Sequence, residues 1–327
     1  MTVRCHLCES TQSQIVSQKD KHGNDLETRA CLGCGLVFNH PVPSDAELAR
    51  FYRVDYRTDY KGSEEPSGRQ IVRNFIRTRD HIDRYFDMFE PAQSVLDVGA
   101  GSGEFVFAMD MLGKRAVGIE PNEGYSTYCR SQLHVDVLSR QISDAKFKSK
   151  SFDLINLSHV LEHLNDPVAA LSKLAGWLKD DGVLYVEVPN VFDYARTKSM
   201  GKMFHYGHIN NFSPWTLRKA AERAGFEECE ESRKRSSGKT GVFFRKSAQA
   251  IDARDAINAE HAAQVVSALD THYAGWSMSK LLGWLPGKIK NFVVKQYRQL
   301  STTLSSMQHD DAAAIGASVL EPLTKKR

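Results

Sequence analysis

The sequence predicts an α/β fold in which a mostly parallel sheet carries helices on both faces, with a cysteine-rich module before it and a helical extension after it. Two apolar runs, at 94–98 and 115–120, flank a glycine turn and an amphipathic segment, which is the pattern of a strand–helix–strand unit. Two C-x-x-C motifs precede this unit, and an alanine-rich, helix-favouring segment follows it. These observations divide the chain into four predicted parts: residues 1–45, 46–93, 94–247 and 248–327.

Length and composition fit one α/β core with appended modules. The chain has 327 residues, of which 41% are hydrophobic and 25% are charged, so it can bury a full core. The net charge of +3 argues against a dedicated surface for duplex nucleic acid. A polar N-terminal start and the lack of a long uncharged apolar run predict a cytoplasmic protein, in which cysteines stay reduced and can bind metal.

The first part is a predicted zinc ribbon, a small module in which two knuckles share one metal ion. Its ligands are four thiolates, from Cys5, Cys8, Cys31 and Cys34. Two C-x-x-C pairs can close one tetrahedral site, and four protein ligands leave no open position, so the zinc is expected to be structural. The residues between the two pairs are expected to form a hairpin. The alternative for these cysteines is a disulfide or a redox pair.

Residues 46–93 are a predicted helical connector. Tyr52, Tyr56 and Tyr60 recur at helical spacing. This spacing fits a buried tyrosine stripe or a lid over an acceptor pocket, and in the second case Tyr60 is a catalytic candidate that hydrogen-bonds the substrate. Apolar residues then recur with a helical period from Arg69 to Phe89, which predicts a further helix.

A glycine turn follows the first core strand. The motif is D-x-G-x-G-x-G, formed by Asp97, Gly99, Gly101 and Gly103, and the next strand ends in Glu120. Glycine permits positive φ and lets the backbone approach a ligand closely. Dinucleotide-binding folds use G-x-G-x-x-G to bind a pyrophosphate. The leading acid here, Asp97, would repel a pyrophosphate but suits an ammonium group. A carboxylate at the end of the second strand is placed to bind two ribose hydroxyls.

These residues resemble the first motif of class I S-adenosylmethionine-dependent methyltransferases, which have a Rossmann-like sheet. The resemblance implies that the glycine turn binds the methionyl end of S-adenosylmethionine (SAM) and that Glu120 binds its ribose. By the same resemblance, Pro121, Ser158 and His159 are cofactor-binding candidates. The residue that contacts adenine is left open among three candidates: Gln141, Ile142 and Asp144.

A pair of histidines, His159 and His163, follows a later core strand in the run S-H-V-L-E-H-L. The run resembles the fourth motif of methyltransferases with an L-E-H-L signature. The resemblance implies that His159 lies near the cofactor and that Glu162 and His163 shape the floor of the pocket. Two histidines at i and i+4 also suit a metal ion, but the sequence shows no third ligand.

A histidine-rich loop precedes a helix that is predicted to begin at Ser213. The loop resembles the E-H-x-x-Y-F-S motif of zinc-ribbon sugar C-methyltransferases, and His208 aligns with the histidine of that motif. Two positions differ: Gly207 replaces the glutamate and Asn211 replaces the tyrosine. The resemblance implies that His208 is the general base beside the acceptor, and His205 is a second catalytic candidate. A histidine with a pKa near 6.5 can serve as a base at neutral pH. The alternative is that both histidines only hydrogen-bond loop carbonyls.

The last part, residues 248–327, is predicted to begin with helix and to be weakly structured from Ser305 onward. Residues 276–298 combine tryptophans and lysines in an amphipathic segment. Such a segment suits packing on the core or on a partner in a homodimer, and it also suits peripheral contact with the inner face of an anionic membrane. Packing is favoured over membrane contact.

The residues and the resemblance together imply a SAM-dependent methyltransferase that acts on a sugar or nucleotide-sugar, a precursor of cell-surface glycans. One alternative is an RNA methyltransferase that holds its substrate with the ribbon and the basic turn at 231–240. The ribbon lacks a dense basic cluster with interleaved aromatic residues, which argues against RNA. The other alternative is a non-catalytic SAM-binding or scaffold module.

Overall fold

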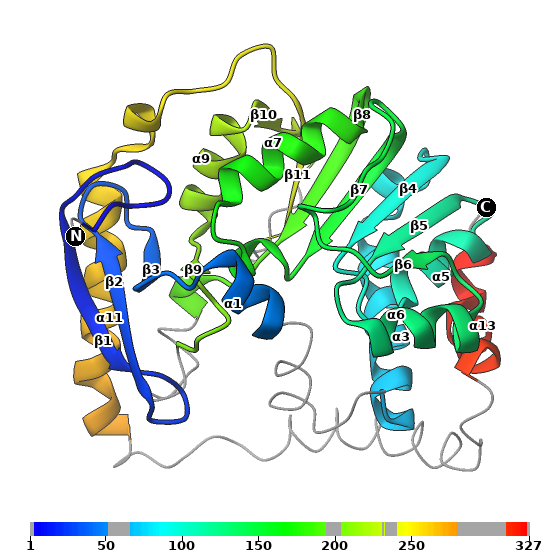
Figure 1. Cartoon of the computed structure of the whole chain (residues 1–327), viewed down its shortest axis with the longest axis horizontal. Coiled ribbons are helices and arrows are strands. Elements are labelled where there is room, and N and C mark those ends of the chain that lie inside the picture. Colours follow the sequence, from blue (N-terminus) through cyan, green and yellow to red (C-terminus); the bar gives the residue numbers. More distant parts are fainter. Residues whose placement is uncertain are drawn as a thin grey trace. The chain divides into compact units, whose positions relative to one another are not determined.

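The computed structural model describes residues 3–51, 66–193, 204–230, 232, 241–279 and 312–325. Within these ranges the strands form two sheets (Figure 1). A four-stranded antiparallel sheet has the order β1-β2-β3-β9, and a seven-stranded mixed sheet has the order β10-β11-β8-β7-β4-β5-β6. The chain therefore has the predicted α/β fold with a Rossmann-like sheet.

Internal contacts divide the chain into two compact units. The first unit contains residues 1–49 and 146–281, and the second contains residues 50–145 and 282–327. Helix α1 (Asp45–Arg50) ends at the boundary between the two ranges.

The ribbon of the first unit is an antiparallel sheet. Its strands are β1 (Ser13–Lys19), β2 (Asp25–Cys31), β3 (Val37–His40) and β9 (Asn210–Asn211). The pairing of β1 with β2 confirms the predicted hairpin. Strand β9 belongs to the histidine-rich loop, so the ribbon sheet extends into a segment that is distant in the sequence.

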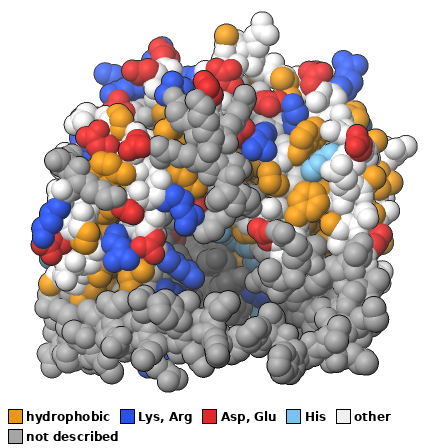
Figure 2. All heavy atoms as spheres, turned by 180° about the vertical axis from the view of Figure 1, so that it is seen from behind, with side chains coloured by type: hydrophobic (Ala, Val, Ile, Leu, Met, Phe, Trp, Pro, Cys, Tyr) orange, Lys and Arg blue, Asp and Glu red, His pale blue; other side chains and the backbone are white. Residues whose placement is uncertain are grey.

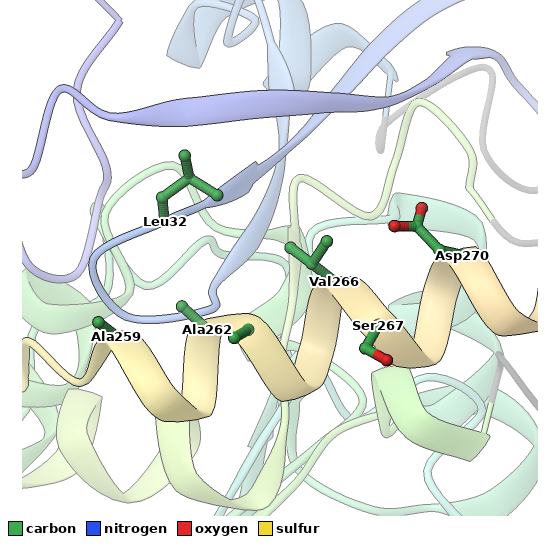
Figure 3. Close-up of a pocket in the computed structure, with 7 residues that line it drawn as sticks. Leu32, Ala259, Ala262, Val266, Ser267 and Asp270 are labelled. Atoms are coloured by element: carbon green, nitrogen blue, oxygen red, sulfur yellow. The ribbon is translucent and has the colours of Figure 1, made fainter.

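Helix α11 (Ala259–Ser279) packs on the ribbon. Ala30 and Val37 of the ribbon form one hydrophobic cluster with Val265 and Leu269 of the helix. The second cysteine knuckle lies close to the helix backbone, since a Cβ on Gly35 would lie 3.1 Å from the Cα atom of Ala262. Leu32 of the same knuckle faces Val266 across an open groove with a volume of about 450 Å³ (Figure 3).

The rest of the first unit supplies four strands of the larger sheet and the helices beside them. The strands are β7 (Phe152–Ser158), β8 (Leu178–Glu187), β10 (Phe226–Glu228) and β11 (Gly241–Lys246). The helices are α7 (Pro167–Trp177) and α9 (Pro214–Arg223), with short 3₁₀ turns at Leu161–His163 and Ala253–Ala256. Strands β7 and β8 are parallel, whereas β10 and β11 form the antiparallel pair that ends the sheet.

The second unit supplies three parallel strands. They are β4 (Ser94–Val98), β5 (Arg115–Ile119) and β6 (Val137–Leu138). Between them lie α5 (Glu104–Met111) and α6 (Glu123–Tyr128), followed by a π-helical turn at Cys129–Leu133. The helix predicted before β4 is present as α3 (Gly68–Arg84) and α4 (Phe86–Phe89).

The end of the chain corrects one prediction. The sequence predicts weak structure from Ser305, but residues Ala312–Thr324 form helix α13, which packs on α3 and α5. Ile315 and Leu320 are buried there. Gly316 allows close approach, because a Cβ at this position would lie 2.5 Å from Cζ of Phe75. The absence of a side chain at Gly316 therefore lets α13 pack closely on α3.

Several predicted features lie outside the described residues. They are the tyrosine stripe with Tyr60, most of the basic turn at 231–240, and most of the amphipathic segment at 276–298. None of the described helices combines the length and the apolar character needed to cross a membrane.

Candidate functional site

The glycine turn of the second unit connects β4 to α5. Gly99, Gly101 and Gly103 have φ values of 74°, 56° and 85°. All three lie in the left-handed region, which glycine adopts without the steric penalty that a Cβ brings. Asp97, in the strand just before the turn, is buried, with 4% of its surface exposed. The predicted motif therefore forms a turn whose conformation requires its glycines.

Glu120 joins this turn to the start of α6. Its Oε2 accepts a hydrogen bond of 2.9 Å from the amide of Gly101, and its Oε1 accepts one of 3.0 Å from the amide of Asn122. Asn122 in turn caps α6 by accepting from the amide of Tyr125. The carboxylate predicted to bind a ribose is thus also a structural part of the loop that would contact the cofactor.

Cys129 lies against the inner side of the turn. Its Sγ donates to the carbonyl of Gly101 over 3.4 Å, and a Cβ on Gly103 would lie only 2.8 Å from the same sulfur. Burial, together with the nearby carboxylates of Glu104 and Glu120, raises the pKa of the Cys129 thiol well above its usual value. Cys129 is therefore a neutral packing residue at neutral pH.

Helix α3 is attached to the same turn by a polar network that sequence reasoning missed. The amide of Asn74 donates to Oγ of Ser102 over 3.1 Å and to Oε1 of Glu104 over 3.0 Å. Ser102 also donates to Oε1 of Glu104 over 2.6 Å. The only signal in the sequence is the polar pair Ser102 and Glu104 at the start of α5, and nothing local indicates that Asn74 completes it.

The three candidates for the adenine contact lie in a turn after β6. The carbonyl of Gln141 accepts from the amide of Asp144, and the Asp144 carboxylate accepts from the hydroxyl of Ser143. Asp144 is exposed, whereas Gln141 and Ile142 are half-buried. This geometry does not select one of the three.

In the first unit, Ser158 ends β7 and His159 follows it. His159 has a φ of 56°, an uncommon conformation for a non-glycine residue, and its amide donates to the carbonyl of Glu187 over 2.8 Å. Desolvation alone would lower the pKa of His159. The carboxylates of Glu162 and Glu187, which lie 3.5 Å and 3.3 Å from its ring nitrogens, outweigh that effect and raise the pKa to about 10.

Glu162, His163 and His208 come together in one cluster. One ligand-type atom from each of them lies within 4.8 Å of those from the other two. Oε1 of Glu162 lies 3.8 Å from Nε2 of His163 and 4.0 Å from Nε2 of His208. The ring centroids of His163 and His208 are 4.9 Å apart, and those of His205 and His208 are 3.8 Å apart.

This cluster corrects the reading of His159 and His163 as an i, i+4 pair without a third ligand. The positive φ of His159 and the 3₁₀ turn at Leu161–His163 break the helical spacing. His159 lies 3.5 Å from Glu162 but does not belong to the group in which all three ligand atoms are close together. The third group is His208, which the fold brings in from a distant loop. The resemblance implies only that Glu162 shapes the pocket floor, whereas its Oε1 lies within 4.0 Å of both imidazoles.

Burial keeps the two loop histidines neutral. Desolvation and the neighbouring histidines lower the pKa of His208 well below its usual value. Desolvation, assisted by the positive charge of Lys21, lowers the pKa of His205 to about 3. His205 also accepts a hydrogen bond from the amide of Gly207 through Nδ1, which fits the neutral ring.

The ribbon holds this loop in place. Asn39 of β3 is buried, and its side-chain amide donates to the carbonyls of His205 and His208, each over 3.1 Å. His6, which lies between the first two cysteines, donates through Nδ1 to Oδ1 of Asn210 over 2.8 Å. Asn210 in turn donates to the carbonyl of Leu164 over 2.7 Å. The first knuckle is therefore linked to the residue that follows His163.

The four cysteines form a compact buried group. The sulfurs of Cys5 and Cys34 are 3.6 Å apart, and those of Cys8 and Cys31 are 3.5 Å apart. A disulfide needs a separation of about 2.0 Å, whereas two sulfurs bound to one zinc ion lie about 3.8 Å apart. All four are free thiols, and the backbone amides of Leu7, Gly33 and Leu36 donate to three of the sulfurs. The arrangement fits one tetrahedral metal ion and excludes the alternative of a disulfide pair in this structure.

Part of the chain is similar to known methyltransferases. Residues 71–231 match the family model described as a methyltransferase domain. A ubiquinone biosynthesis O-methyltransferase from Rhodopseudomonas palustris is 26% identical over 162 residues, which cover 46% of this chain and 64% of the relative. A tRNA U34 carboxymethyltransferase from Aliarcobacter butzleri is 28% identical over 161 residues, which cover 46% of this chain and 51% of the relative. The chain thus spans less than two thirds of the length of either relative.

Solved structures of methyltransferases are also similar. A SAM-dependent methyltransferase from Archaeoglobus fulgidus is 21% identical, with a TM-score of 0.42 and coverage of 58% of this chain and 96% of that chain. The 1,6-didemethyltoxoflavin-N1-methyltransferase from Burkholderia thailandensis is 17% identical, with a TM-score of 0.44 and coverage of 65% and 96%. Residues 71–231 thus match a methyltransferase domain, and the strand order and the glycine turn agree with the Rossmann-like fold of such a domain.

The glycine turn yields a prediction about stability. Gly103→Ala should lower the free energy of unfolding by about 2 kcal/mol, because alanine is strained at a positive φ and its Cβ would overlap the Cys129 sulfur. Gly176→Ala in α7 is the matched control, since its Cβ position has no atom within 4 Å apart from its chain neighbours and its own helix backbone, and helix propensity favours alanine. Chemical denaturation measures both, and equal stability of the two variants would contradict the prediction.

Proposed function

We propose that this chain transfers a methyl group from SAM to a hydroxyl of a small acceptor, a sugar or a nucleotide-sugar. The observation that carries the proposal is the glycine turn closed by Glu120, which lies inside the segment that matches the methyltransferase family. The relatives named as O-methyltransferases support an oxygen acceptor. The choice of a sugar depends on the resemblance of the histidine-rich loop to the sugar methyltransferase motif.

The residues of the turn suit the cofactor. The positive φ values of Gly99 and Gly101 form a turn whose backbone a ligand can approach closely, and the buried acids Asp97 and Glu120 match an ammonium group and a ribose diol respectively. Pro121, Ser158 and His159 are further cofactor-binding candidates. When bound, SAM supplies an electrophilic methyl group on a sulfonium centre. Positioning of the acceptor oxygen in line with that methyl group should then supply most of the rate.

On the acceptor side we assign proton removal to the cluster around His208. Its backbone carbonyl is held by Asn39 of the ribbon, and its ring can accept a proton because it is neutral. Burial lowers the pKa of His208 well below the value near 6.5 expected from the sequence, which makes it a weaker base than an exposed histidine. His205 stacks on it and its Nδ1 is already engaged by Gly207, which makes His205 the weaker candidate. Tyr60 remains a predicted substrate contact from the sequence alone.

An RNA acceptor is the second candidate, because one relative is named as a tRNA U34 carboxymethyltransferase. RNA binding depends on neutralising a chain of phosphates with a basic surface. Figure 2 shows acidic and basic side chains interspersed on one face of the molecule. The net charge of +3 and this mixing favour a small acceptor over RNA.

We further propose that the cysteine group binds one structural zinc ion. Four sulfur ligands close the coordination sphere, so the ion has no position for substrate. Its role would be to hold the two knuckles together, and through His6 and Asn39 to hold the histidine-rich loop. The chain would act in the cytoplasm, where thiols stay reduced. A homodimer and peripheral membrane contact through 276–298 remain proposals that depend on the sequence.

The cofactor assignment has a direct test. Asp97→Ala should weaken binding of S-adenosylhomocysteine at least about tenfold, because a charged hydrogen bond to the cofactor ammonium is lost. Asp136→Ala, which removes an exposed acid of the same unit, should bind like the wild type. Isothermal titration calorimetry measures both. Equally weak binding by the wild type and Asp97→Ala would refute the assignment.

The acceptor assignment is tested with labelled SAM. Label should enter one or more members of a nucleotide-sugar panel and should not enter bulk tRNA, while label in tRNA alone would favour the RNA alternative. His208→Gln should lower the rate at least about a hundredfold without changing the affinity for S-adenosylhomocysteine, because only proton removal is affected. Tyr206→Phe, a change to an exposed side chain of the same loop, is the control and should keep its rate.

The zinc proposal predicts a change in metal content. Cys31→Ser should lose one zinc ion per chain and should unfold at a lower temperature, because the ion stabilises only the folded ribbon. Cys229→Ser, which alters a buried cysteine outside the group, should keep its zinc. Elemental analysis and thermal unfolding measure the two effects. The same zinc content in both variants would show that the cysteines do not bind the ion.

A further inference from the structure

We propose that Glu162, His163 and His208 form a second metal site, which binds a divalent transition-metal ion beside the acceptor. The inference deepens the proposed function, because it names how the cluster activates the acceptor hydroxyl, but binding of the ion does not depend on methyl transfer. The site is separate from the cysteine group and differs from it in ligand chemistry.

The spacing of the three residues fits ligands of one ion. Oε1 of Glu162 lies 3.8 Å from Nε2 of His163 and 4.0 Å from Nε2 of His208, both too long for hydrogen bonds. Two atoms that each lie about 2.1 Å from one ion are about 3.4 Å apart in a tetrahedral site and about 4.2 Å apart across an octahedral one. The observed separations exceed the tetrahedral value by 0.4 and 0.6 Å, so small side-chain rotations would bring the three atoms onto one ion.

The buried carboxylate of Glu162 is the independent observation. The residue is only 1% exposed, and neither of its oxygens has a hydrogen-bond partner within the described part of the chain. A buried carboxylate without hydrogen bonds is costly, and native proteins supply such groups with donors, positive charge or metal ions. Three imidazoles surround Glu162, but all stand 3.5 Å or more from its Oε1, so the nearby His159 cation balances part of its charge without a good hydrogen bond. One cation between Glu162, His163 and His208 would supply the partner that the Glu162 carboxylate lacks among the described residues.

The surroundings of His163 match those of metal-binding histidines. Its Nδ1 donates to the carbonyl of Gly207 over 2.6 Å, because a carbonyl can only accept. In the neutral ring this fixes the lone pair on Nε2, the nitrogen that faces Glu162. Histidine ligands commonly donate their other ring nitrogen to a backbone carbonyl or a carboxylate in this way.

The ligand set selects the class of ion. Two imidazoles and one carboxylate suit zinc and the neighbouring first-row divalent ions, whereas magnesium and calcium prefer oxygen ligands. Three protein ligands also leave at least one position open, as in catalytic sites and in contrast to a four-cysteine site. An acceptor hydroxyl could therefore bind the ion directly.

An ion at this site would lower the pKa of that hydroxyl, as metal ions do for bound water. The hydroxyl proton would pass to solvent water. The acceptor oxygen would then form a bond to the methyl carbon as the carbon–sulfur bond of SAM breaks and its electron pair returns to sulfur. In this arrangement His208 acts as a ligand that positions the ion, and the ion carries out the activation that the sequence assigns to His208 as a base.

Manganese is the best probe, because it binds oxygen and nitrogen ligands and competes poorly for the cysteine thiolates. Metal that copurifies with the full chain is first removed by mild chelation. The chain is then titrated with Mn²⁺, and binding is followed by electron paramagnetic resonance. We expect saturable uptake of one Mn²⁺ per chain. Glu162→Gln and His208→Asn should each weaken this uptake at least about tenfold.

The control is His134→Asn, which removes an exposed imidazole outside the cluster at a left-handed position that asparagine tolerates. It should take up Mn²⁺ like the wild type. Circular dichroism checks that each variant is folded. Lack of saturable uptake by the wild-type chain, or equal uptake by all folded variants, would overturn the proposal.

The outcomes separate this proposal from the proposed function. If Mn²⁺ uptake depends on Glu162 but no tested acceptor is methylated, the metal site is supported and the proposed acceptor is wrong. Binding of S-adenosylhomocysteine and methyl transfer without any Mn²⁺ uptake would overturn the metal site alone. In that case His208 would act as an unassisted base.

Discussion

A buried carboxylate must find partners, and in the second unit the partners of Glu120 are the backbone amides of Gly101 and Asn122. Loss of either bond would leave a desolvated charge, so the carboxylate fixes the glycine turn on one side and the start of α6 on the other. The residue assigned to the cofactor ribose thus also builds the loop that would receive the cofactor. Binding and folding depend on the same group, so a change at Glu120 would affect both.

Glu162 of the first unit is also a buried carboxylate, but within the part of the chain that the structure describes it lacks the backbone donors that Glu120 has. No backbone amide of the described residues reaches its oxygens, and the nearest groups are imidazoles that stand too far away to donate well. The ribbon keeps these imidazoles in position through Asn39 and, by way of His6 and Asn210, through Leu164. The ribbon therefore acts as a scaffold for the cluster.

The parts that the sequence predicts well are those set by local pattern. The glycine turn, the hairpin between the cysteine pairs and the cap of α9 at Ser213 all depend on residues close together in the chain. The histidine cluster could not be predicted in the same way. It requires a left-handed residue at His159, a 3₁₀ turn in place of a helix, and a loop that is brought in by pairing with the ribbon. Helix α13 was missed because its contacts with α3 are also distant in sequence.

The two candidate metal sites differ in what their ligands leave open, and this difference separates their roles. Four sulfurs complete a tetrahedron, so an ion among them can only hold the knuckles together. Glu162, His163 and His208 leave coordination positions for a substrate oxygen, and their positions depend on the ribbon through Asn39. A closed site would thus stabilise the scaffold that aligns an open one. The ribbon would contribute to catalysis without contacting the acceptor, since removal of its ion would release the loop that carries His208.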